Sequence, residues 1–96
     1  MFEKIKLALR IDVDELDGEI KDTIEAAISD LKLCGVSKSK IVETDPLILR
    51  AVKTFCRAEF SSDEKEAARL KESYEMIRNH LCLSIEYTQT QDVIKL

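Results

Sequence analysis

The chain has 96 residues, a net charge of −4 and 35% charged residues, which suits one domain with strongly charged outer faces. Its hydrophobic content of 45% predicts a folded core rather than disorder. The acidic balance argues against a protein that grips nucleic acid through the phosphates, because such binding needs a basic stripe.

The first part of the chain predicts two helices. Residues 2–9 are a short helical candidate, and residues 14–34 form a longer one in which apolar side chains recur every three or four positions. Asp12 or Asp14 is expected to cap the longer helix at its N-terminus. Gly35 stands where a left-handed C-cap belongs.

The clearest helix start is the pair Asp45 and Pro46. An aspartate side chain can accept hydrogen bonds from the free N–H groups of the first turn, and proline fits the first helical position. A broad apolar face then runs through residues 46–60, which makes this the most hydrophobic helix and the expected centre of the fold. Leu49 lies off that face and is a candidate for a second contact surface.

A fourth helix is predicted over residues 62–83. Ser61 and Glu64 have the spacing of a capping box, and the apolar positions that follow form the narrow seam of a helix bundle. From Ser84 onward the residues are polar or β-branched, without a helical stripe. Residues 84–96 are therefore interpreted as a flexible C-terminal arm that orders only on a partner.

These patterns together predict an all-α fold, a small bundle of four helices over residues 1–83, followed by the arm. The apolar stripes are expected to share one core. Its predicted members are Leu16, Ile20, Ile24, Ile28, Leu31, Ile48, Val52, Phe55, Phe60, Leu70, Tyr74, Ile77 and Leu81.

The cysteines, the N-terminal residues and the length of the apolar runs indicate in which cellular compartment the protein resides. Cys34, Cys56 and Cys82 contain no C-x-x-C pair, and we interpret them as three small apolar residues in a reducing environment. The N-terminal sequence lacks a signal-peptide core, and no apolar run approaches the ~20 residues of a membrane span. We therefore expect a protein that is made and kept in a cytoplasm, without a membrane partner.

The sequence offers no catalytic, cofactor-binding or metal-ligating set. His80 has no recognisable catalytic partner nearby in the sequence. Asp12, Asp14 and Asp17 miss the spacing of a calcium loop and are better explained by helix capping. The acids that open the fourth helix would repel a DNA backbone, which argues against a DNA-reading helix-turn-helix.

The order of these signals resembles the small head–tail connector proteins of tailed bacteriophages, also described as DNA-packaging or head-completion adaptors. The resemblance spans residues 2–83. The segments that carry it are KIKLALRI (4–11), EIKDTIEAA (19–27), DPLI (45–48), RAV (50–52), FCRAEF (55–60) and ESYEMI (72–77), leading to Leu81. The chain departs from the family at Ser61, where glycine is frequent, and at Cys56, where an aromatic residue is common.

The resemblance implies a structural subunit of the virion neck, assembled in the bacterial host cytoplasm. About a dozen copies would form a ring beneath the portal protein and extend the DNA channel. The ring would also offer a platform to a head-completion or tail-joining protein, and DNA would pass without sequence-specific binding. The alternative is a small helical binding or regulatory module from a phage or another mobile element.

A ring needs two different contact patches on each subunit. Candidate assembly contacts lie off the predicted core, in the loop of residues 36–44 and in the arm. They are Leu49, Ile41, Val42, Ile85, Tyr87, Val93 and Ile94. We also expect an acidic or mixed channel lining that keeps DNA from sticking.

Overall fold

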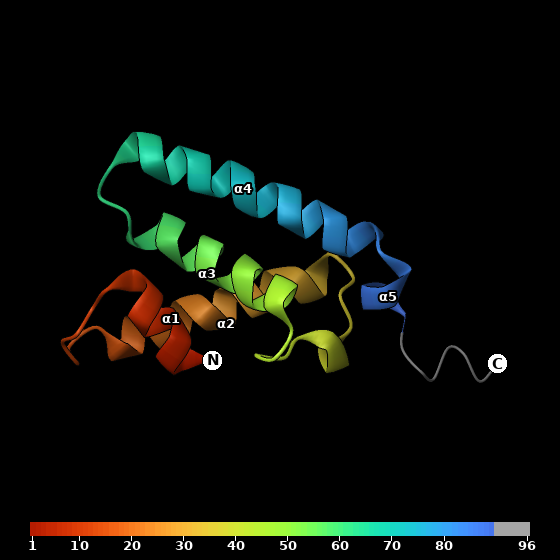
Figure 1. Cartoon of the computed structure of the whole chain (residues 1–96), viewed down its shortest axis with the longest axis horizontal. Helices are drawn as coiled ribbons and strands as arrows, with labels where there is room; N and C mark the ends of the chain where they lie inside the picture. Colours follow the sequence, from red (N-terminus) through yellow and green to blue (C-terminus); the bar gives the residue numbers. More distant parts are fainter. Residues whose placement is uncertain (90–96) are drawn as a thin grey trace.

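The computed structural model describes residues 1–89 and shows only helices and loops in that part of the chain (Figure 1). The all-α prediction is therefore confirmed. The elements in chain order are α1 (Phe2–Leu9), α2 (Asp17–Leu33), the short 3-10 helix η1 (Lys38–Lys40), α3 (Pro46–Phe60), α4 (Glu64–Leu83) and α5 (Ile85–Thr88). None of these helices has both the length and the apolar content that crossing a membrane requires.

Helix α3 is the centre of the molecule, with α4 along one side and the pair α1 and α2 along the other (Figure 1). It begins as the sequence predicts: the Asp45 carboxylate accepts hydrogen bonds from the N–H groups of Leu47 (2.9 Å) and Ile48 (3.2 Å), and Pro46 is the first helical residue. Its buried side chains meet those of all three neighbouring helices. This explains why its apolar face is so broad.

The predicted core residues divide into three groups. Seven are buried: Ile20, Ile24, Leu31, Ile48, Val52, Tyr74 and Leu81. Five are partly buried and pack against that core: Leu16, Ile28, Phe55, Phe60 and Ile77. Leu70 is half-buried and lies outside the cluster. Ile5 of α1 is fully buried in the core as well, so the first helix packs on the domain.

Helix α2 begins at Asp17, three residues later than predicted, and no side chain caps it. The expectation that Asp12 or Asp14 caps this helix is wrong. Instead, the Lys6 ammonium lies 2.8 Å from a carboxylate oxygen of Asp14 and 2.8 Å from one of Asp17. Lys6 thereby lowers the pKa of Asp14, and this ion pairing joins the start of α2 to α1.

Helix α4 begins at Glu64, and its cap is Asp63 rather than Ser61. The Asp63 carboxylate accepts hydrogen bonds from the N–H groups of Lys65 (3.0 Å) and Glu66 (3.4 Å). The predicted capping box at Ser61 is therefore wrong. Ser61 ends α3, and its hydroxyl oxygen accepts a hydrogen bond from the Asp63 N–H, which orients the residue that does cap the helix.

Gly35 ends α2 in the predicted manner, with a φ of +108°. The Gly35 N–H donates to the Lys32 carbonyl and the Val36 N–H to the Leu31 carbonyl, which is the Schellman arrangement. Helix α1 ends with the same pair of bonds, but the residue with positive φ there is Arg10 (φ 59°).

The chain after α4 turns back onto the domain. Residues 84–89 include α5, which packs near the loop before α3 (Figure 1). Residues 84–89 therefore belong to the folded domain rather than to the expected arm, and residues 90–96 of that arm lie outside the described residues. The sequence did not predict α5, because four helical residues are too few to show a periodic apolar stripe.

Candidate assembly surfaces

The docked C-terminal segment is held by Tyr87. Its carbonyl accepts a 2.8 Å hydrogen bond from the Ser37 N–H, and its hydroxyl donates to the Asp45 carboxylate at 2.9 Å. Partial burial and the adjacent carboxylate raise the pKa of Tyr87 to about 12. Asp45 therefore serves two elements, since it caps α3 and anchors the segment that follows α4.

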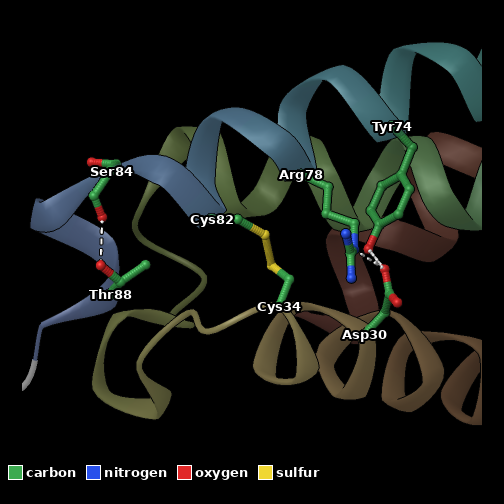
Figure 2. Close-up of a disulfide and its surroundings, with 7 residues drawn as sticks. All are labelled: Asp30, Cys34, Tyr74, Arg78, Cys82, Ser84 and Thr88. Atoms are coloured by element: carbon green, nitrogen blue, oxygen red, sulfur yellow. Dashed lines mark hydrogen bonds and ion pairs between the residues drawn. A yellow bond between two sulfur atoms is a disulfide. The ribbon is translucent and has the colours of Figure 1, made fainter.

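A disulfide joins Cys34 at the end of α2 to Cys82 near the end of α4, with their Cα atoms 5.6 Å apart (Figure 2). The interpretation of the cysteines as three small apolar residues in a reducing environment is wrong for these two. Cys56 is a free, buried thiol, and burial raises its pKa to about 12. The bridged pair is 48 residues apart, and the sequence did not predict the bridge, because the spacing of the three cysteines does not indicate which of them pair.

A polar cluster lies one turn from the disulfide, between the same two helices (Figure 2). The Tyr74 hydroxyl donates to Asp30 at 2.5 Å, and the Arg78 Nε donates to the same carboxylate oxygen at 2.7 Å. Burial and the Asp30 carboxylate both raise the pKa of Tyr74. The Tyr74 ring also meets the edge of Phe55 on α3, with centroids 5.1 Å apart. This cluster fixes the position of α4 over α2 and α3.

A groove of about 1100 Å³ runs along the outer face of α3 beside the end of α1. Four cations, Arg10, Arg50, Lys53 and Arg57, line it together with one acid, Glu66, so the groove is predominantly basic. None of them makes an ion pair with a residue that the structure describes. We name this feature the basic groove. Three of these cations, at positions 50, 53 and 57, lie on one face of a helix and could be recognised in the sequence. The acidic net charge of the whole chain does not indicate such a local basic surface.

An exposed apolar cluster marks the end of the molecule that carries the disulfide. Leu33 and Leu83 each adjoin a bridged cysteine and are 83% and 84% exposed, and Ile85 is 68% exposed. Large apolar side chains at such exposure, at one end of the molecule, are typical of contact surfaces. We name these three residues the apolar end.

The predicted contact residues occupy different environments. Leu49 and Ile41 are both partly buried and pack against the core, and Leu49 also lines the basic groove. Val42 is 42% exposed, and Ile85 belongs to the apolar end. Tyr87 is partly buried by the contacts described above. Val93 and Ile94 lie outside the described residues.

Metal-ligating side chains do not converge in the described part of the chain. No three histidine, cysteine, aspartate or glutamate side chains there are grouped as a metal site would require. His80 is exposed on α4. The geometry instead presents charged and apolar surfaces suited to contact.

Comparison with protein families agrees with this arrangement. The phage connector protein family matches residues 1–88, which is nearly the whole described chain. The chain belongs to the phage connector family. Neither the curated proteins nor the solved structures that were searched include a match.

The resemblance to head–tail connector proteins is therefore confirmed. Connector proteins are structural rather than catalytic, and they work with other head and tail proteins at the neck of the virion.

Proposed function

We propose that this connector forms a closed ring of about a dozen copies beneath the portal protein, where it extends the channel through which DNA leaves the head. The ring would also present a platform to a head-completion or tail-joining protein. Assembly would occur in the bacterial host cytoplasm, after DNA packaging. DNA would pass along the lumen without sequence-specific contacts.

The observation that carries this proposal is the family match across residues 1–88, which is the complete helical domain including α5. Two further features support it. The subunit carries chemically different surfaces, the basic groove and the apolar end, and a ring needs unlike patches on each copy. The apolar end is suited to a contact with a different protein, because its three exposed side chains would lose water on docking.

The test is co-expression of the connector with the portal protein of its own phage, followed by electron microscopy of the purified complex. We expect a ring of connector subunits coaxial with the portal ring. One variant replaces Leu33 and Leu83 with serine and so alters the apolar end. The control variant replaces Leu7, a similarly exposed leucine on α1, with serine. Failure of the wild-type chain to bind the portal or to form rings would refute the proposal.

A further inference from the structure

The basic groove has the composition of a protein-binding surface. Arg50, Lys53 and Arg57 project from one face of α3 and span about 10 Å along its axis. Arg50 and Arg57 are exposed, so their charges face water rather than an internal partner. Between the cations lie Leu47, Leu49 and Phe60, which are partly buried. A concave surface with apolar side chains between unpaired cations fits an acidic protein surface better than a phosphate backbone.

The chain itself offers a complementary surface on α2. Glu19, Asp22 and Glu25 are exposed and follow one another at intervals of three residues, spanning about 9 Å. None of the three makes an ion pair with a described residue. The base between them, Lys21, is directed over the ring of Phe2, 5.0 Å from its centroid. We name these three acids the α2 acidic face.

The two surfaces cannot meet within one molecule. The buried residues Ile20, Ile24 and Ala27 turn one side of α2 toward the core, so the α2 acidic face points away from it. The basic groove lies on the outer side of α3, away from the core face of that helix. An acidic face and a basic face of similar length, facing outward from different helices, are suited to head-to-tail contact between copies.

We propose that the basic groove of each connector subunit binds the α2 acidic face of the next copy, and that this contact closes the ring. The inference rests on the proposed ring function and names its interface. The partner is a second copy of this chain, and a nucleic-acid surface in the groove is the competing outcome of the test.

The first experiment is zero-length carbodiimide cross-linking of an equal mixture of unlabelled and isotope-labelled chains, on rings assembled with the portal. Lys53 is the probe, because its amine lies in the groove and can couple to a carboxylate in contact with it. We expect mixed-label peptides that join Lys53 to Asp22 or Glu25. Rings without such peptides would overturn the interface while leaving the ring function intact. An absence of rings would overturn both.

The second experiment reverses the charges. The double variants Arg50→Glu with Arg57→Glu, and Asp22→Lys with Glu25→Lys, should each reduce assembly more than about tenfold, because like charges then face each other. An equimolar mixture of the two variants should restore it, since each variant complements the other, which a folding defect cannot do. Arg69→Glu, a single reversal of the same kind on α4 outside the groove, is the control and should assemble normally.

The nucleic-acid alternative is tested on the same proteins. If the Arg50→Glu with Arg57→Glu variant assembles normally but loses binding to a short DNA duplex, the groove faces DNA and the proposal is overturned. Normal assembly of this variant with unchanged duplex binding overturns the proposal as well. If the variant loses assembly and the wild-type rings leave the duplex unbound, the proposed contact between copies is supported.

Discussion

Asp45 shows how one side chain can stabilise two distant segments. It caps α3 and also accepts the Tyr87 hydroxyl, so Asp45→Ala removes both contacts at once. We expect a loss of about 2 kcal/mol in the free energy of unfolding, against about 1 kcal/mol for Tyr87→Phe. The double variant should cost less than the sum, because both single changes remove the same hydrogen bond.

Denaturant unfolding of the four proteins of this cycle gives the measurement. Asp63→Ala is the matched control, since Asp63 caps α4 without a tyrosine partner and should cost about 1 kcal/mol. Additive losses in the Asp45 and Tyr87 cycle would show that the hydroxyl bond contributes nothing.

Tyr87 also makes the docked segment sensitive to alkaline pH. Its pKa is raised from 10.0 to about 12 in the folded chain, so the folded state holds the phenol proton more tightly than the unfolded state. The resulting stabilisation is complete below pH 10 and is lost as the pH rises toward 12. The pKa of Tyr74, the other tyrosine of the chain, is raised too. An absorbance titration should therefore show no tyrosinate at pH 9 to 10, and a step there that disappears in Tyr87→Phe would contradict this.

At the scale of the elements, the disulfide is the contact between α2 and α4 with the largest expected effect. It closes a 48-residue separation, and breaking it should lower the free energy of unfolding by about 2–4 kcal/mol. We expect Cys34→Ser to melt well below the oxidised wild type. A reductant should bring the wild type down to the variant and leave the variant unchanged. Equal melting of oxidised and reduced wild-type protein would refute the role of the bridge.

The ends of α1 and α2 provide a matched pair of backbone tests. Both use a residue with positive φ, Arg10 in one and Gly35 in the other. Arg10→Gly should stabilise the chain by up to about 1 kcal/mol, whereas Gly35→Ala should destabilise it by about 1 kcal/mol. Space is available at Gly35, since a Cβ would lie 3.9 Å from Thr88, so the loss would come from the backbone. Thermal melting under reducing and oxidising conditions measures both effects. A destabilised Arg10→Gly variant or a stabilised Gly35→Ala variant would contradict the role assigned to positive φ at these positions.

The sequence predicted the middles of the helices better than their ends. Apolar periodicity located α2, α3 and α4, because that pattern is set by burial against a common core. The ends depend on competition between neighbouring side chains. Asp63 rather than Ser61 caps α4, and Asp14 forms an ion pair with Lys6 instead of capping α2. Such choices depend on tertiary contacts that linear spacing does not encode.

At the scale of the whole molecule, the candidate surfaces were predicted only in part. Leu49 was expected to serve a contact because it lies off the predicted apolar face of α3; it packs partly against the core and lines the basic groove, and its role in assembly stays a prediction. The groove itself was not predicted, because the approach of Arg10 on α1 to the cations of α3 depends on the tertiary fold. The apolar end was equally hidden. Leu33 and Leu83 are distant in sequence, and the disulfide between their neighbours Cys34 and Cys82 places them at the same end of the molecule.

The salt dependence of assembly distinguishes between these two surfaces. The groove and the α2 acidic face are both exposed, and the screening length falls from about 10 Å at 0.1 M salt to about 3 Å at 1 M. If they form the contact between copies, sodium chloride over that range should lower the weight-average mass measured by sedimentation, and Arg69→Glu should respond as the wild type does. Association through the apolar end would behave oppositely, because apolar burial is not screened and sulfate strengthens it. A mass that holds in sodium chloride and rises in sodium sulfate would therefore move the contact between copies from the charged faces to Leu33, Leu83 and Ile85.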